Sequence, residues 1–358
     1  MLTSSRRLWL TTLLLVFGIG FLAGCPLSPR SQQNTAVLLK TEDATREQLM
    51  NEVNRFAKVN SIHAKMYLKF EDNSFAEAGS KEVYKSADGD IVVQRPSKIY
   101  MRVQVPVIKT DVAQMTSDGT KFCVAILQDG GDGKNKKFVT GSNDADYSKL
   151  QKELKSADLD NGKTLKANVS AFANLRPQHF TDAMLVRPID PANVYTQSTI
   201  FQLEEDVTQE KKSPIRKVMR GYYLLDEYVK DAAGNLQIAR RFWFDRVINV
   251  RLARQQIFDG RGDIASDIVY GIPGTLSENG EYANLPLRIT VTRPKDKYSM
   301  TLTYQAPESA TIGKIWPETA FHLQNSWGLK ELDLDKELQE VSAGQPRTDN
   351  QNTATKFQ

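Results

Sequence analysis

Residues that build metal centres or disulfide frameworks are few in this chain of 358 residues, which has two cysteines and three histidines. A disulfide-stapled fold, a zinc cluster and a haem site are therefore not expected. The chain also has little excess of one charge over the other, because 47 Lys and Arg against 43 Asp and Glu give a net charge of +4. So small a surplus provides no electrostatic footprint for nucleic acid, and we expect no nucleic-acid partner.

Catalytic motifs are missing as well. The sequence holds no G-x-S-x-G elbow, no P-loop and no H-E-x-x-H zinc motif. The three histidines are isolated, and the acidic stretches at 129–132 and 158–162 lack the spacing of an EF-hand loop. We therefore expect a protein that is not an enzyme and that uses no metal and no cofactor.

The N-terminus has the features of an export signal. Arg6 and Arg7 precede an apolar run from Leu8 to Leu22, which is shorter than the roughly 20 residues of a typical membrane span. The run ends in Leu-Ala-Gly-Cys, which resembles the lipobox of bacterial lipoproteins. That resemblance implies a signal peptide over 1–24, cleavage between Gly24 and Cys25, and acylation of Cys25, for example with palmitate. An uncleaved signal anchor and ordinary cleavage beside an incidental cysteine are the alternatives.

Acylation of Cys25 would make membrane lipid a partner of the chain and place it in the bacterial cell envelope. We expect the periplasmic face of the outer membrane, because proline and not aspartate follows Cys25. Residues 25–42 then form a tether, since their early composition of Pro, Ser and Gln does not pack into a core. Cys123 lies in an apolar run and is expected to be a buried small hydrophobe.

The folded part alternates with period two after one helix. A capping box at 45–48 precedes an apolar stripe, which predicts a helix over roughly 45–58. Apolar and polar residues then alternate from Ile62 to Phe70, which indicates a half-buried strand. A hairpin is predicted at 85–95, with Asp88 and Gly89 as its turn. Further strands are expected around 99–105, 112–116 and 121–127.

A helical insert interrupts the strands at about 145–190, with helices expected at 147–159, 167–175 and 180–186. Strands return at 199–205, 218–229, 237–244, 248–257, 264–270, 287–292 and 299–304. The polar residues 341–358 are expected to be a disordered tail. A sheet of so many strands must curl. The predicted fold class is therefore mainly β (α+β): a large antiparallel open or half β-barrel over residues 43–340, with an N-terminal helix and a helical insert covering the concave face.

Methionine and aromatic side chains recur on the apolar faces of the predicted strands, and such residues suit an adaptable pocket. The candidate cavity-lining residues are Met66, Phe70, Met101, Val103, Phe242, Phe244, Met300, Leu302 and Tyr304. The alternative is a core in which the same residues pack on the helices at 167–186 and leave no space for a ligand.

The order of the segments resembles the LolA/LolB lipoprotein-carrier superfamily. The resemblance is carried by a helix running into Ile62–Phe70, by the stretch 90–102 with its Arg95-Pro96 pair, and by the late strands at 241–270 and 289–304. It implies an open half-barrel closed by helices, an acyl chain bound inside, and a contact of Arg95 with a helical lid. The segments at 129–160 and 305–340 have no counterpart in the carriers.

Two functions follow as hypotheses. The first is a membrane-anchored carrier or acceptor that holds an acyl chain, a lipid or a lipoprotein in an apolar cavity. The second is a structural or protein-interaction module of the cell envelope, with a filled core and no ligand. In either case we expect a monomer.

Overall fold

The computed structural model describes residues 35–72, 82–83, 86–128, 133, 136–147, 150, 176–247, 249–276 and 282–343. The predicted signal peptide, Gly24, Cys25, the helix at 167–175, nearly all of the helix at 147–159 and the tail from 344 lie outside these residues. The chain forms two compact units. The larger unit spans 40–202 and 220–358, and the smaller one contains 1–39 and 203–219.

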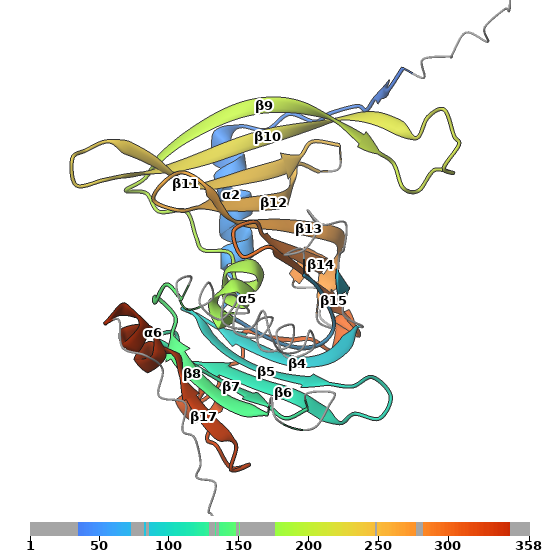
Figure 1. Ribbon diagram of the computed structural model, residues 1–358. Helices are drawn as coiled ribbons and strands as arrows, with labels where there is room; N and C mark the ends of the chain where they lie inside the picture. The colour runs from blue at the N-terminus through green and yellow to red at the C-terminus, as the bar shows by residue number, and fades with distance from the viewer. Residues whose placement is uncertain are drawn as a thin grey trace, which may run out of the picture. The chain divides into compact units, whose positions relative to one another are not determined.

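Helix α2, Arg46–Ala57, is the first helix of the larger unit (Figure 1). The Thr45 hydroxyl accepts a hydrogen bond from the backbone N–H of Gln48, and the Gln48 side chain accepts one from the backbone N–H of Thr45. This reciprocal capping box satisfies two backbone donors that a helix start otherwise leaves unpaired. The buried residues of the helix are Leu49, Val53 and Phe56. The helix predicted at 45–58 is confirmed.

The first part of the sheet contains strands that follow one another along the chain. They are β2 (Ser61–Asp72), β3 (Glu82–Val83), β4 (Ala87–Gln94), β5 (Lys98–Gln104), β6 (Asp111–Ser117), β7 (Lys121–Ile126) and β8 (Lys137–Ser142). From β4 to β8 each strand pairs antiparallel with the next, and β2 pairs antiparallel with β4. Short turns and period-two alternation lead to this arrangement, because they favour neighbouring antiparallel strands.

The predicted hairpin at 85–95 is wrong. Asp88 and Gly89 lie inside strand β4, paired with β2. A Cβ atom on Gly89 would lie only 2.8 Å from the Leu68 side chain. The glycine therefore permits a close approach between two strands, which is a common reason for glycine inside a strand.

The second part of the sheet continues from the first through β15, which pairs antiparallel with β2. Its strands are β9 (Val194–Glu205), β10 (Lys217–Lys230), β11 (Leu236–Asp245), β12 (Arg251–Phe258), β13 (Ile264–Leu276), β14 (Tyr282–Arg293) and β15 (Tyr298–Tyr304). From β10 to β15 each strand pairs antiparallel with the next. The strands predicted between 199 and 304 are confirmed in number and order.

Short elements follow β15, and two of them, the strands β16 and β17, join the same sheet. They are η2 (Pro307–Ser309), β16 (Thr311–Ile312), η3 (Glu318–Phe321), β17 (Lys330–Asp333) and α6 (Leu334–Ser342). Strand β17 pairs with β8 in parallel, so the sheet is mixed and not purely antiparallel as expected. The mainly β fold with an open sheet is confirmed.

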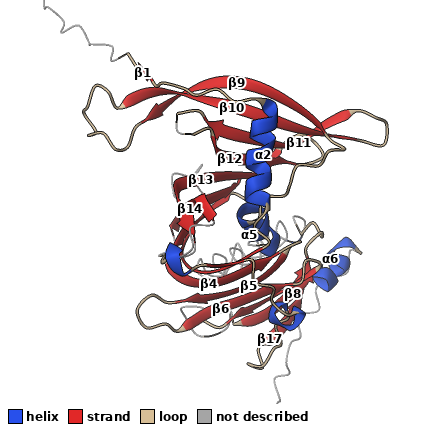
Figure 2. Ribbon diagram, turned by 180° about the vertical axis from the view of Figure 1, so that it is seen from behind, coloured by secondary structure: helices blue, strands red, loops and turns tan. Residues whose placement is uncertain are grey.

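Helix α5, Pro177–Met184, is the described part of the predicted helical insert. It contacts β4, β5 and β6 from one part of the sheet and β14 from the other. Helices α2 and α5 both lie on the concave side of the sheet (Figure 2). The described part of the insert therefore lies on the concave face, as the sequence predicts.

The smaller unit combines the start of the described chain with the hairpin end of β9 and β10. Strand β1, Val37–Leu38, pairs in parallel with Val218 and Met219 of β10. The Asp206 N–H donates to the Arg216 carbonyl and closes the hairpin.

Candidate binding interior

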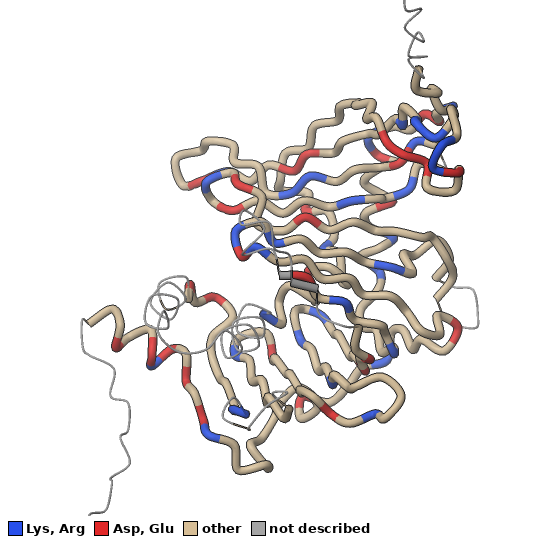
Figure 3. Tube along the Cα trace, turned by 45° about the vertical axis from the view of Figure 1, so that its right-hand side comes forward, with Lys and Arg blue, Asp and Glu red and all other residues tan. Residues whose placement is uncertain are grey.

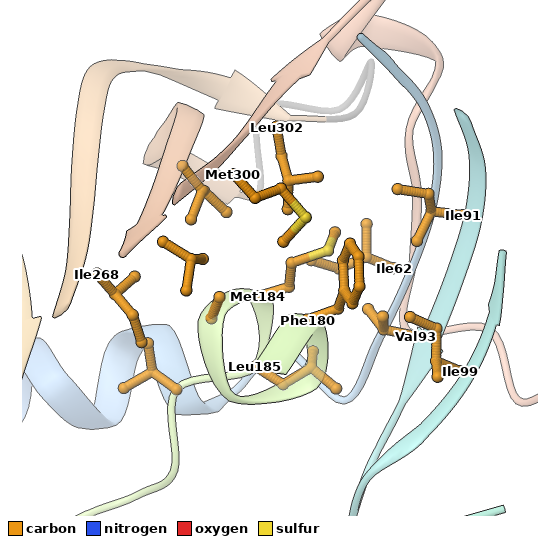
Figure 4. Close-up of a cluster of buried hydrophobic side chains, with 14 of the residues drawn as sticks. Ile62, Ile91, Val93, Ile99, Phe180, Met184, Leu185, Ile268, Met300 and Leu302 are labelled. Atoms are coloured by element: carbon orange, nitrogen blue, oxygen red, sulfur yellow. The ribbon is translucent and has the colours of Figure 1, made fainter. Parts of the chain in front are cut away.

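Helix α5 buries most of its side chains against the concave face. Its buried residues are Pro177, His179, Phe180, Thr181, Ala183 and Met184. Figure 4 shows Phe180 and Met184 beside Ile62 of β2, with Met300 and Leu302 of β15 close by. All five residues belong to one cluster of buried apolar side chains. The interior of the sheet is therefore occupied by the chain's own helix.

The structure brings the candidate cavity residues together. Eight of the nine are buried in the same apolar cluster, with exposed fractions from 0% for Met66, Phe242, Phe244 and Leu302 to 8% for Val103. Phe70 is partly buried and packs against the cluster. Their alternation along the strands located them correctly on the inner face. Whether they line a ligand site stays a prediction.

A small hollow remains between α2, α5 and the sheet. Its volume is about 20 Å³, which is room for about one water molecule. It is lined by Phe56, Val59, Ile62, Ala183, Met184, Val186, Tyr270, Leu276, Leu285, Pro286, Ile289 and Tyr304. Pockets for small ligands usually measure about 300 Å³ or more. This hollow could hold an acyl chain only after α5 had moved.

Arg95 connects the sheet to the chain at the end of α5. It follows β4 directly, and its Nε donates to the Val59 carbonyl at 3.0 Å. Its Nη1 and Nη2 donate to the carbonyls of Leu185 and Val186 at 3.4 and 2.6 Å. Burial lowers the pKa of the guanidinium from its ordinary high value. The side chain thus binds the carbonyls of the C-cap residue of α5 and of the residue after it.

Arg240 of β11 binds the next two carbonyls. Its Nη1 donates to the Arg187 carbonyl at 2.8 Å and its Nη2 to the Pro188 carbonyl at 2.9 Å. Two arginines, one directly after β4 and one in β11, therefore bind four consecutive carbonyls, those of residues 185–188. Arg240 is not among the candidates that the sequence suggested. It lies two residues before Phe242 on β11, and side chains two residues apart in a strand lie on the same face, so the alternation could have indicated it.

Glu227 is the counter-ion of Arg240, and both side chains are nearly fully buried. The Glu227 carboxylate also accepts hydrogen bonds from Asn193 Nδ2 at 2.7 Å and from Tyr195 Oη at 2.8 Å. Burial acts to raise the pKa of Glu227, but Arg240 and the two further donors outweigh it and hold that pKa below its ordinary value. Burial, with the nearby carboxylate, raises the pKa of Tyr195 to about 12.

Helix α5 carries two further ionisable groups. His179 Nδ1 is hydrogen-bonded to the Tyr298 hydroxyl, and burial lowers the pKa of His179 well below its ordinary value. Burial raises the pKa of the Asp182 carboxyl. Both shifts favour the uncharged forms, which suits a helix that lies in an apolar interior.

Within the part of the chain that the structure describes, no three His, Cys, Asp or Glu side chains are placed to hold a metal ion. None of the helices in those described residues has the length and apolar character that crossing a membrane requires. Cys123 is half-buried, and burial raises the pKa of its thiol.

Comparison with known proteins gives matches only among solved structures. No protein-family model and no curated protein matches the chain. A LolA superfamily protein from Nitrosomonas europaea matches at 10% identity and a TM-score of 0.39, over 78% of this chain and 99% of that one. A DUF1329 family protein from Desulfovibrio piger matches at 9% identity and a TM-score of 0.37, over 77% and 95%.

A third structure, an outer membrane lipoprotein-sorting protein domain from Vibrio parahaemolyticus, also matches at 9% identity and a TM-score of 0.37, over 77% and 95% of the two chains.

Proposed function

We propose that this chain is a non-enzymatic envelope lipoprotein that binds an acyl chain, a lipid or a lipoprotein in the apolar interior of its sheet. The signal peptide is removed between Gly24 and Cys25, and acylated Cys25 anchors a monomer to the periplasmic face of the outer membrane. The observation that carries the proposal is the way α5 is held. A largely buried helix occupies the interior, and the chain at its C-terminal end is fixed by hydrogen bonds from Arg95 and Arg240.

Binding requires α5 to leave the concave face and the ligand to take its place. When the ligand takes the place of α5, the apolar side chains of the sheet exchange one apolar neighbour for another and stay out of water. Methionine side chains such as Met66 and Met300 adapt to a changed neighbour because they are unbranched and polarizable. The carbonyls that Arg95 releases can bond to water instead. Displacement is therefore opposed by these polar contacts and by the exposure of α5's own apolar side chains, such as Phe180 and Met184, to water.

One observation favours the alternative, a structural or interaction module with a filled core. The hollow of about 20 Å³ is what such a core would contain. The two functions differ in whether α5 can be displaced, and this difference is measurable.

The test uses a chain that begins at Pro26, which keeps every described residue and has no acyl anchor. The purified chain is extracted for bound lipid, analysed by mass spectrometry, and titrated with a fluorescent fatty acid and with palmitate as competitor. Amide hydrogen exchange of 177–186 is measured with and without palmitate. We expect competed binding together with faster exchange in α5. If no lipid binds and the exchange of α5 is unchanged, the module is the correct function.

Anchoring is tested separately in the full chain. We expect Cys25→Ser to remain unacylated and to leave the membrane fraction, whereas Cys123→Ser should be acylated and retained as in the parent. A single acyl chain binds a membrane only reversibly, so stable anchoring requires the several acyl chains of a lipoprotein. The serine variant would lack these chains. Firm membrane attachment of Cys25→Ser would refute the lipobox prediction.

A further inference from the structure

Apolar side chains are concentrated on the surface of the smaller unit. Five of the fifteen exposed large hydrophobic residues in the described chain belong to it: Val37, Leu38, Leu203, Val207 and Ile215. Val207 is 80% exposed, and Ile215 is 52% exposed. The two flank the hairpin closure between Asp206 and Arg216, so they lie at the same end of the hairpin. So dense a group of exposed apolar residues marks a surface that contacts another apolar phase.

The direction of β1 places the N-terminal chain at that same end. Strand β10 leaves the hairpin turn at Lys217, and β1 pairs with it in parallel, Val37 opposite Val218. Because the two strands run in the same direction, Ala36 lies near Lys217, at the end of β10 that adjoins the hairpin turn.

We propose that the hairpin end, residues 203–219, lies on the phospholipid bilayer to which Cys25 is anchored. This inference rests on the proposed acylation. Eleven residues lie between Cys25 and Val37, and a fully extended segment of this length spans at most about 40 Å. The anchor thus keeps the hairpin end close to the membrane. A short tether raises the effective concentration of the bilayer at this surface, so contacts too weak to bind alone become occupied.

Apolar contact and not charge drives the association. Residues 203–217 carry four bases, Lys211, Lys212, Arg216 and Lys217, and four acids, Glu204, Glu205, Asp206 and Glu210. Figure 3 shows both signs together at this hairpin end. Arg216 is paired with Glu205 at 3.0 Å. With no net charge, the surface gains little from anionic lipid, whereas Val207 and Ile215 can enter the interface.

The experiment supplies the anchor chemically, so it does not depend on acylation in the cell. A chain that begins at Cys25 and carries Cys123→Ala is coupled through Cys25 to vesicles of phosphatidylethanolamine and phosphatidylglycerol that contain a maleimide lipid. Amide hydrogen exchange is compared between coupled and uncoupled protein. We expect exchange in 203–217 to slow about tenfold on coupling, equivalent to about 1.4 kcal/mol. The protection should persist when phosphatidylcholine replaces phosphatidylglycerol.

Variants identify the side chains responsible. The double variant Val207→Ser, Ile215→Ser should lose the protection, whereas Leu236→Ser should keep it, since Leu236 is also 52% exposed but belongs to the larger unit. Equal exchange of 203–217 in coupled and uncoupled protein would overturn the proposal. So would protection that already appears in uncoupled protein as its concentration rises, because it would assign the surface to self-association. Either result leaves the proposed binding of lipid in the interior, which was tested without an anchor, unaffected.

Discussion

Replacing Arg95 with methionine should loosen helix α5 and leave the sheet folded. The substitution keeps an unbranched side chain of similar length but removes the hydrogen bonds to the carbonyls of Leu185 and Val186. A hydrogen bond from a charged group contributes about 1.5–3 kcal/mol. Two such bonds together would contribute about 3–6 kcal/mol. Because Arg95 is only about half-buried and its bond to the Leu185 carbonyl is long at 3.4 Å, we expect a smaller loss of about 2–4 kcal/mol.

Amide hydrogen exchange reports this loss directly. A decrease of about 2–4 kcal/mol in the free energy of local opening accelerates exchange roughly 30-fold to 700-fold, since each 1.4 kcal/mol is a factor of ten. The acceleration should be confined to residues 177–188. Arg102→Met is the matched control, because Arg102 belongs to the neighbouring strand β5 and donates to Asp90 at 2.9 Å. Unchanged exchange of α5 in Arg95→Met, or equal acceleration in Arg102→Met, would refute the role assigned to Arg95.

Three further substitutions follow from the burial and pairing of single side chains. Phe180→Ala should lower the free energy of unfolding by about 3–5 kcal/mol in urea denaturation, because Phe180 is 1% exposed. Arg240→Met should cost about 3–5 kcal/mol by leaving Glu227 buried without its partner. The double variant Glu227→Leu, Arg240→Met should recover much of that loss, and additive single effects would contradict the pairing. A hydrogen bond from His63 holds the pKa of Asp90 below its ordinary value. The ionised Asp90 carboxylate therefore stabilises the fold above its unfolded-state pKa, and this stabilisation is lost as the pH falls through the folded-state pKa. Asp90→Asn should therefore flatten the acid side of the stability profile, and an unchanged profile would contradict this role of Asp90.

The sequence predicted most of the elements because each of them is specified locally. The capping box fixes the start of α2, and its apolar stripe decides which face is buried. Period-two alternation places Met101, Phe242 and Leu302 on the inner face without any knowledge of their neighbours. Such patterns depend only on the geometry of a single strand or helix, so one sequence is sufficient to recognise them.

What the sequence did not reveal depends on contacts between distant segments. Asp88 and Gly89 have the composition of a hairpin turn, and only the approach of Leu68 shows that the glycine serves a strand. The partner of Arg240 is 13 residues away along the chain and is set by the register of β10 on β11. The carbonyls that Arg240 binds belong to a loop 52 and 53 residues earlier. No local pattern encodes such pairings.

The distribution of polar contacts along α5 determines how the helix would leave the interior. Four hydrogen bonds fix its C-terminal end through the carbonyls of 185–188. Its N-terminal half has two polar contacts, Arg176 with the Asn143 carbonyl and His179 with Tyr298, and no side-chain cap. A helix without an N-terminal cap opens more readily at that end, because its first N–H groups gain little from staying in place. The hinge should therefore lie at 185–188, and Phe180 should leave the sheet before Leu185. In the exchange experiment this order predicts the fastest amides near the start of α5 and the slowest at its end, and Arg95→Met should reduce or reverse the gradient.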